Sequence, residues 1–121
     1  AVTEKDCAPA LKARATRVLF RTRTFEHKGP FHEDFAYISP EAVRTLGQAG
    51  VLLIGLDTPS VDPFSSKDLP AHNMLMEYGI RNLEGLDLTE VPDGTYELIA
   101  LPLKLSGCDA SPVRAILRST T

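Results

Sequence analysis

The sequence predicts an α/β fold, a mixed sheet with short flanking helices, and two neighbouring segments carry that prediction. Ser39-Pro40-Glu41 is a typical helix start, because serine can cap the helix, proline has the φ of the first turn and a carboxylate favours the positive end of the helix dipole. Residues 51–56 (VLLIGL) follow Gly50 and do not alternate in polarity, which is typical of a strand buried on both faces. A helix, a glycine turn and a buried strand in this order indicate an α/β unit.

Apolar runs and turn residues predict the other elements. Gly79 ends one helical pattern, and the turn residues 91–94 (VPDG) precede the longest predicted strand, which Pro102 interrupts. In chain order we expect a weak helix at residues 3–12, a strand at 17–22, a loop at 23–37, the helix from residue 39 and the strand at 51–56 described above, a helix at 69–78, and strands at 80–86, 95–105 and 113–118.

The length and composition fit one domain of residues 1–121. Apolar residues make up 43% and charged residues 24% of the chain, which is typical of a globular protein. The 13 Lys and Arg against 16 Asp and Glu give a net charge of −3 without a basic block, so we expect no nucleic-acid partner. No apolar run approaches the ~20 residues that cross a bilayer. We therefore expect a cytoplasmic protein without membrane association, in which Cys7 and Cys108 are reduced thiols.

His72 and Glu84 form the most informative pair of polar residues, since motifs for nucleotide binding, serine hydrolysis and HExxH zinc binding are absent. His72 lies at the start of a predicted helix, and Glu84 lies in the strand that follows. The helix rises about 9 Å beyond His72 and the strand returns about 13 Å, so both side chains are expected at the same level. An imidazole beside a carboxylate suits a divalent metal such as zinc or manganese.

Ordinary roles remain open for both residues. A histidine at a helix start is generally a surface or packing residue, and a strand glutamate commonly faces water or an arginine such as Arg81. Two ligands are also fewer than the three protein groups of a catalytic zinc site, and the sequence offers no obvious third.

Two other polar segments carry weaker signals. His27 and His32 lie in the irregular loop, where a solvated histidine is the ordinary outcome. The loop of residues 57–68 follows the carboxyl end of a buried strand, where ligands bind in open α/β sheets, but it lacks the spacing of a calcium loop. We expect its Asp and Ser side chains to hold the loop in shape by hydrogen bonds.

Four segments occur in a characteristic order: IGLDTPSVDP (54–63), SSKDLPAHN (65–73), NLEGLDLTEVPDGTYELIALPLKL (82–105) and CDASPVRAILR (108–118). Together they closely resemble the C-terminal half of bacterial kynurenine formamidases, or arylformamidases, which belong to the metal-dependent cyclase family. The resemblance extends from about Arg17 to Arg118. Its tail, DASPVRAILR, is more specific to the kynurenine formamidases than to the cyclase family at large.

The resemblance implies hydrolysis of N-formyl-L-kynurenine to L-kynurenine and formate, a step of tryptophan breakdown. It also implies the swivelling β/β/α fold, a centre of two zinc ions with manganese as the alternative, and assembly into homodimers or larger homo-oligomers. The family's C-terminal metal ligands, a histidine in "AH" and a glutamate in "LEG", fall on His72 and Glu84. By this resemblance Glu84 bridges both metals and His72 holds one.

The chain also departs from the family. The signature HxGTHxDxPxH, which supplies most of the metal ligands and the general acid and base, matches no stretch, so nothing carries over to His27 or His32. The family's substrate-contacting tryptophan has no counterpart, since the chain has no Trp. We therefore expect residues 1–121 to be the C-terminal portion of a longer enzyme, inactive alone and without an identifiable catalytic or substrate-binding residue. The alternatives are another cyclase-family hydrolase, acting on a lactam or lactone, and a non-catalytic binding domain.

Overall fold

The computed structural model describes residues 1–120, which divide into two compact units. The first unit comprises residues 1–90, and the second begins at Val91. Both lie within the range predicted as a single domain. Within the described residues, no helix has the length and apolar character needed to cross a membrane.

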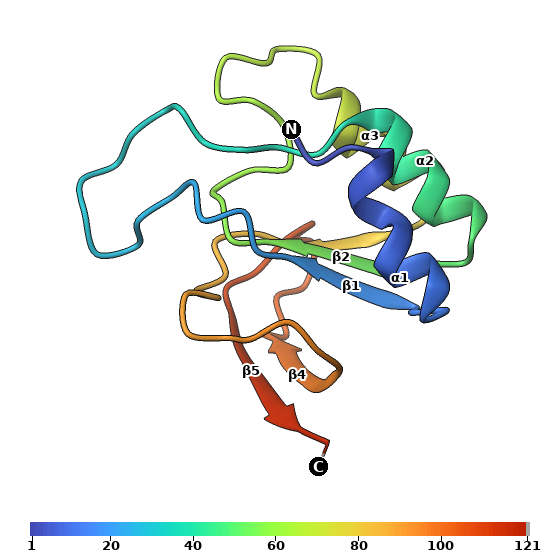
Figure 1. Cartoon of the computed structure of the whole chain (residues 1–121). Helices are drawn as coiled ribbons and strands as arrows, with labels where there is room; N and C mark the ends of the chain where they lie inside the picture. The colour runs from blue at the N-terminus through green and yellow to red at the C-terminus, as the bar shows by residue number, and fades with distance from the viewer. Residues whose placement is uncertain (121) are drawn as a thin grey trace. The chain divides into compact units, whose positions relative to one another are not determined.

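The first unit is built on a three-stranded parallel sheet (Figure 1). Its strands are β1 (Arg17–Phe20), β2 (Leu53–Leu56) and β3 (Arg81–Leu83), and β2 lies in the centre. Ile54 of β2 pairs with Val18 on one side and with Asn82 on the other. Because all strands run in the same direction, their carboxyl ends lie at one edge of the sheet, where the loops that follow them begin.

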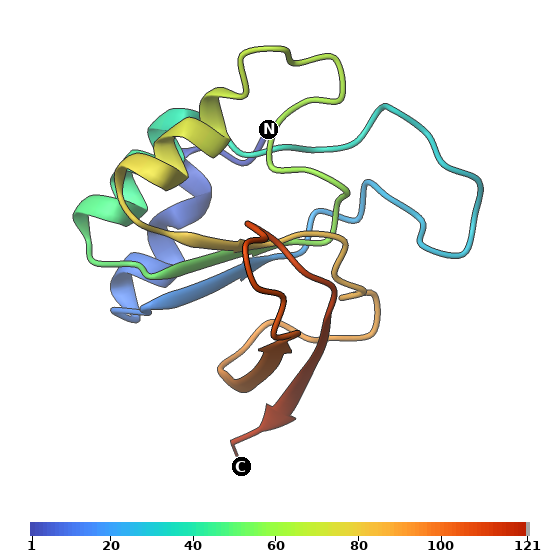
Figure 2. The same ribbon diagram turned by 180° about the vertical axis from the view of Figure 1, so that it is seen from behind.

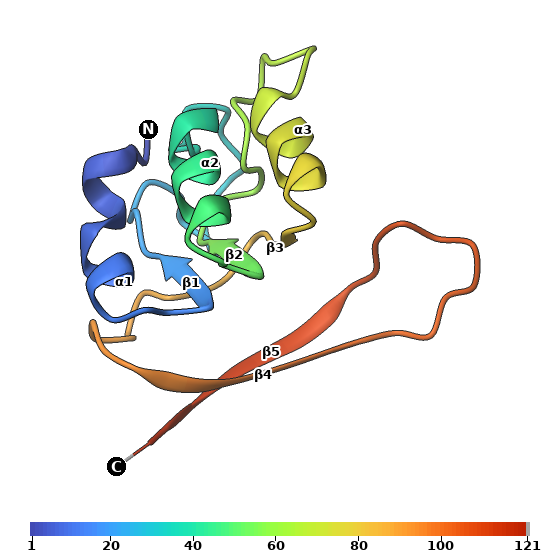
Figure 3. The ribbon, with the colours of Figure 1, turned by 90° about the vertical axis from the view of Figure 1, so that its right-hand side faces the viewer.

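Three helices cover one face of this sheet (Figures 2 and 3). The first, α1 (Ala8–Lys12), follows a 3₁₀ turn, η1 (Glu4–Cys7), and the others are α2 (Pro40–Gln48) and α3 (Pro70–Glu77). Between them, α2 and α3 connect β1 to β2 and β2 to β3, so each parallel pair is joined by a crossover that contains a helix. The predicted α/β class with short flanking helices is confirmed.

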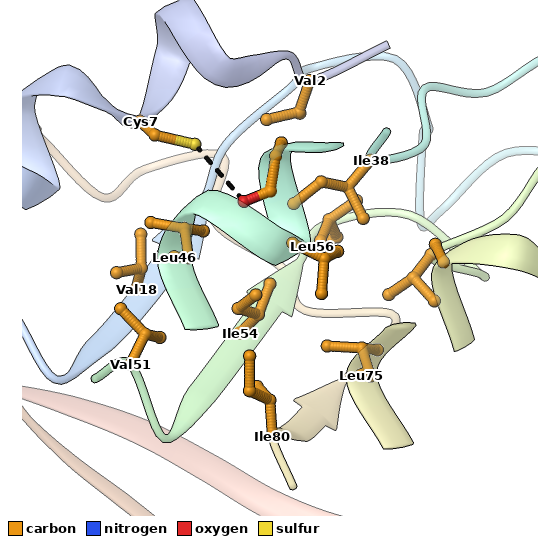
Figure 4. Packing of buried hydrophobic residues seen from close by; sticks show 14 residues of the cluster. Val2, Cys7, Val18, Ile38, Leu46, Val51, Ile54, Leu56, Leu75 and Ile80 are labelled. Carbon is orange, nitrogen blue, oxygen red and sulfur yellow. Dashed lines mark hydrogen bonds between the residues drawn. The ribbon is translucent and has the colours of Figure 1, made fainter. Parts of the chain in front are cut away.

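The core lies between the helices and the sheet (Figure 4). Leu46 of α2 and Ile54 and Leu56 of β2 are fully buried there, which accounts for the apolar composition of β2. The strand predicted over residues 51–56 begins only at Leu53, and Leu52 is 53% exposed. The Cys7 thiol is also buried and lies 4.0 Å from the carbonyl oxygen of Ala42, and its burial raises the pKa of that thiol. The cluster comprises Val2, Cys7, Val18, Ile38, Ala42, Val43, Leu46, Val51, Ile54, Leu56, Val61, Ala71, Leu75 and Ile80.

The start of α2 shows the local chemistry that the sequence predicts. Ser39 is the N-cap, and its hydroxyl oxygen accepts a hydrogen bond of 3.1 Å from the backbone N–H of Ala42. Pro40 then occupies the first helical position.

Replacing Ser39 with alanine is expected to lower the free energy of unfolding by about 1 kcal/mol, because the Ala42 N–H loses its partner. Urea denaturation of the two proteins measures the difference. Replacement with aspartate, which retains an acceptor oxygen, is the control and should cost less. Equal losses in both variants would contradict the capping role.

The second unit is an antiparallel hairpin of β4 (Tyr96–Pro102) and β5 (Val113–Ser119), visible along its length in Figure 3. Ile99 pairs with Ile116 at its middle. Its apolar side chains are only partly covered within the unit, since Leu101 is 75% and Ile116 50% exposed. The strands of the chain thus divide between a parallel sheet and this antiparallel pair.

Several strands are shorter than the sequence predicts. The strand expected over residues 80–86 ends at Leu83, because Gly85 turns away with a φ of +69° and its N–H bonds the carbonyl of Thr58 in a loop. The strand expected over 95–105 ends at Pro102, which has no N–H to offer the ladder.

Candidate metal centre

Three acidic or basic side chains meet where β2 and β3 end. Asp62 lies in the loop between β2 and α3, His72 lies in the first turn of α3, and Glu84 follows β3 directly. The chain from α3 through β3 therefore returns Glu84 to the vicinity of His72, although a helix and a turn separate the two residues in the sequence.

His72 lies between two carboxylates. Its Nδ1 is 2.7 Å from Oδ2 of Asp62, and its Nε2 is 3.2 Å from Oε1 of Glu84. The side chain of His72 is 35% exposed and that of Glu84 31%, whereas Asp62 is 1% exposed. His72 and Glu84 are therefore both partly accessible to solvent, while Nδ1 of the ring contacts a buried group. The structure brings His72 and Glu84 together, as the lengths of the intervening helix and strand predict.

Asp62 is held by the helix that it precedes. Its two carboxylate oxygens accept hydrogen bonds from the backbone N–H groups of Ala71 (2.8 Å) and His72 (3.0 Å). Leu69 occupies the N-cap of α3 in a left-handed conformation and has no side-chain oxygen, so Asp62 supplies the acceptors that the first turn lacks. Its negative charge also lies at the positive end of the helix dipole.

Glu84 is held by the loop and by its own strand. Its Oε1 accepts a hydrogen bond of 3.3 Å from the backbone N–H of Val61 and one of 3.1 Å from Nδ2 of Asn82. Val61 is fully buried, and it adjoins Asp62 in the sequence. One short loop segment therefore orients the carboxylates on both sides of His72.

The separation of the two side chains fits a shared metal ion. Two ligand atoms at the usual distances from a tetrahedral zinc ion are roughly 3.3 Å apart, close to the separation found here. A nitrogen and a carboxylate oxygen are also donors that zinc and manganese accept. Within residues 1–120, however, no group of three or more His, Cys, Asp or Glu side chains is arranged to hold a metal ion. His72 and Glu84 alone are fewer than the three protein ligands of a catalytic zinc site.

Asp57, the other buried aspartate of this loop, has a structural role. Its carboxylate accepts hydrogen bonds from the backbone N–H groups of Thr22 and Arg23 and from the Thr22 hydroxyl, at 2.7 to 3.0 Å. Arg23 has a φ of 57°, so these bonds hold a strained backbone at the end of β1. The expectation that aspartates of the loop at 57–68 hold the local structure is met by Asp57 and by the capping bonds of Asp62.

His27 and His32 belong to a different place in the fold. Both rings pack against Phe25, with centroids 5.5 and 4.9 Å away. Neither is fully solvated, and Nε2 of His27 is buried without a hydrogen-bond partner among the described residues. Both histidines are half-buried, so the expectation of solvated histidines holds only in part: the His27 ring meets Phe25 edge-to-face and the His32 ring lies tilted against it. An open pocket of about 380 Å³ adjoins them, lined by Arg23, Thr24, Phe25, Glu26, His27, His32, Asp57 and Thr89.

Comparison with known proteins identifies the relatives of this chain. The chain is 54% identical over 107 residues to a protein of Salinibacter ruber named kynurenine formamidase, a match that covers 88% of this chain and 50% of the relative. A second protein of that name, from Polaromonas naphthalenivorans, is 49% identical over 123 residues, which cover 93% of this chain and 54% of the relative. The chain is homologous to kynurenine formamidases. It spans about half the length of these curated relatives.

The match to the kynurenine formamidases includes the candidate metal centre, because a match over 88% of 121 residues cannot omit residues 62–84 at the middle of the chain. A solved structure described as a predicted metal-dependent hydrolase from Bacillus stearothermophilus superposes with a TM-score of 0.80 at 31% identity. This superposition covers 96% of the chain and 56% of that structure and confirms the α/β fold. No family model matches the chain.

Asp62 is the residue of this centre that sequence reasoning missed. It is one of several Asp and Ser residues in the loop at 57–68, and nothing in the local pattern distinguishes it from its neighbours. The one available signal is the N-cap of the following helix, where Leu69 provides no acceptor and an upstream carboxylate must serve instead.

Proposed function

We propose that this chain provides one side of the metal centre of a kynurenine formamidase. In this proposal His72 and Glu84 are metal ligands, and the remaining ligands and the general acid and base come from a portion of the enzyme outside residues 1–121. The observation that carries the proposal is the separation of 3.2 Å between Nε2 of His72 and Oε1 of Glu84, at partly exposed side chains. The proposed substrate, N-formyl-L-kynurenine, follows from the family resemblance, and the name kynurenine formamidase that the relatives carry supports it.

The proposed reaction is hydrolysis of a linear amide. Water adds to the formyl carbon, the C–N bond breaks, formate departs, and the amine nitrogen of L-kynurenine takes a proton. A divalent metal, when bound, polarises the formyl carbonyl and makes water a nucleophile at neutral pH. The contribution of this chain is positional: Val61 and Asn82 fix the carboxylate of Glu84, and the first turn of α3 fixes the imidazole of His72.

The finer features of the proposal follow the family resemblance. We propose two zinc ions, with manganese as the alternative, bridged by Glu84. A homodimer in the bacterial cytoplasm, acting in tryptophan breakdown, completes the proposal. Two observations support parts of this picture: the structural relative is described as metal-dependent, and both cysteines of the chain are free thiols, as is usual in a reducing compartment.

A chimera tests the proposed function. Residues 1–121 replace the matching segment of the Salinibacter ruber relative, which is about half of that protein. In the proposal the remaining length of the relative supplies the rest of the centre. We expect the chimera to release L-kynurenine and formate from N-formyl-L-kynurenine. We also expect a chelator to abolish the activity and zinc or manganese to restore it, while residues 1–121 alone show no turnover.

The control is the unmodified relative, assayed with the same substrate, a cyclic lactam and a lactone. Turnover by residues 1–121 alone would contradict the divided centre. A chimera that hydrolyses only the lactam or the lactone would assign the chain to another hydrolase of the cyclase family. A folded chimera that binds no metal would indicate a non-catalytic binding domain.

A further inference from the structure

We propose that Asp62 is a positioning residue that fixes the tautomer of His72 and so reserves its Nε2 for a cation shared with Glu84. The inference deepens the proposed function and rests on it, because the cation is the metal that His72 and Glu84 are proposed to bind. It adds a residue that neither the sequence pattern nor the similarity to known proteins singles out.

The position of the ring proton follows from the contact at Nδ1. A neutral imidazole has one N–H and one lone pair, whereas an ionised carboxylate only accepts hydrogen bonds. A carboxylate oxygen lies beside each ring nitrogen, but Oδ2 of Asp62 is 2.7 Å from Nδ1 whereas Oε1 of Glu84 is 3.2 Å from Nε2. The shorter contact assigns the proton of the neutral ring to Nδ1, from which it donates to Asp62. The lone pair is then on Nε2.

The other side of the ring completes the argument. The lone pair of Nε2 faces Oε1 of Glu84 at 3.2 Å, so two electron-rich atoms are held close together. Glu84 is kept there by hydrogen bonds from Val61 and Asn82. A cation placed between Nε2 of His72 and Oε1 of Glu84 would be attracted by both atoms, so the two side chains together could provide two ligands of a metal site. A carboxylate on the second ring nitrogen is the usual support of a metal-binding histidine.

Asp62 is well placed to fix the tautomer of His72 because it is buried and hydrogen-bonded to the backbone. Its side chain is 1% exposed, and both oxygens already accept backbone hydrogen bonds from the first turn of α3. Water therefore competes little for Oδ2, and the backbone bonds set the direction of the carboxylate relative to the helix that carries His72. A capping role alone would use Ala71 and the His72 backbone and would not require the contact at Nδ1.

The tautomer can be measured on the unmodified chain. Nitrogen NMR of labelled residues 1–121, at a pH where the ring of His72 is neutral, should show Nδ1 protonated and Nε2 bare. The opposite tautomer would overturn the proposal. This measurement needs no variant and no metal.

The consequence for metal binding is tested in the chimera with Asp62→Asn. Oδ1 of Asp62 accepts from the Ala71 N–H, and Oδ2 accepts from the His72 N–H and contacts Nδ1. In asparagine an NH₂ group replaces one of these oxygens and cannot accept, so either the Ala71 N–H or the His72 side of the contact loses its partner. We expect the affinity for zinc, measured against a competing chelator, to fall by about 10-fold to 100-fold. Ser66→Ala is the matched control, because it removes a hydrogen bond of 3.1 Å to the Leu69 N–H at the same helix start without touching His72. It should leave zinc affinity unchanged.

The outcomes separate this inference from the proposed function. If His72→Ala abolishes zinc binding but Asp62→Asn retains full affinity, the positioning role of Asp62 is wrong and the metal centre stands. If zinc binds equally well without His72 and without Glu84, the proposed centre itself is wrong. An equal loss of zinc affinity in Asp62→Asn and Ser66→Ala would mean that Asp62 acts only as a helix cap.

Discussion

His72→Ala and Glu84→Gln, each made in the chimera with the Salinibacter ruber relative, should lower kcat/KM for N-formyl-L-kynurenine by about 100-fold or more. Each change removes one ligand from the pair that lies 3.2 Å apart. Metal catalysis contributes several kcal/mol to such a reaction, and each 1.36 kcal/mol corresponds to a tenfold change in rate. Bound zinc should fall in parallel, as measured by metal analysis of the purified proteins.

Glu77→Gln provides the matched control for this prediction. Glu77 is the last residue of α3, so its replacement removes a carboxylate from the same helix at the opposite end from His72. Activity and metal content should stay within twofold of the unmodified chimera. Retention of both in Glu84→Gln would exclude Glu84 as a ligand, and a loss in all three variants would point to a general effect of charge or folding.

Ile54→Ala should lower the free energy of unfolding of residues 1–121 by about 2–5 kcal/mol. Ile54 is fully buried, lies on the central strand and pairs with residues of both neighbouring strands. Truncation leaves a cavity under the helices that the surrounding close-packed side chains fill only in part. Since total stabilities of domains are about 5–15 kcal/mol, one such change removes a large part of the margin. Urea denaturation measures the difference.

Leu52→Ala is the control, because Leu52 lies two residues away and is 53% exposed. Its truncation should change the free energy of unfolding by about 0.5 kcal/mol or less. Similar losses in both variants would mean that Leu52 is as well covered in solution as Ile54, contrary to the structure.

The parts of this fold that the sequence predicts are those decided by neighbours in the chain. Ser39 caps α2 through a bond to a residue three positions later, and the apolar composition of residues 51–56 predicts the buried strand β2, although Leu52 just before it is exposed. The meeting of His72 and Glu84 was also predictable, because one short helix, one glycine turn and one strand connect them, and the lengths of these elements fix where the chain returns.

The parts that the sequence does not predict depend on distant contacts. Asp57 bonds Thr22, 35 residues earlier, and Val61 bonds Glu84, 23 residues later. Those bonds give the loop its shape, and the loop then places Asp62 against His72. Likewise, the packing of His27 and His32 on Phe25 depends on how a long irregular loop folds back on itself. No periodicity in the sequence reports such arrangements.

One consequence follows from the fact that His72 and Glu84 belong to different elements, α3 and the chain after β3. An ion held by both would act as a reversible cross-link between helix and sheet. Whatever binds the folded chain and not the unfolded one adds stability in proportion to the logarithm of its free concentration, once that exceeds the dissociation constant. The free metal concentration would then affect the free energy of unfolding of this chain as well as the activity of the proposed centre.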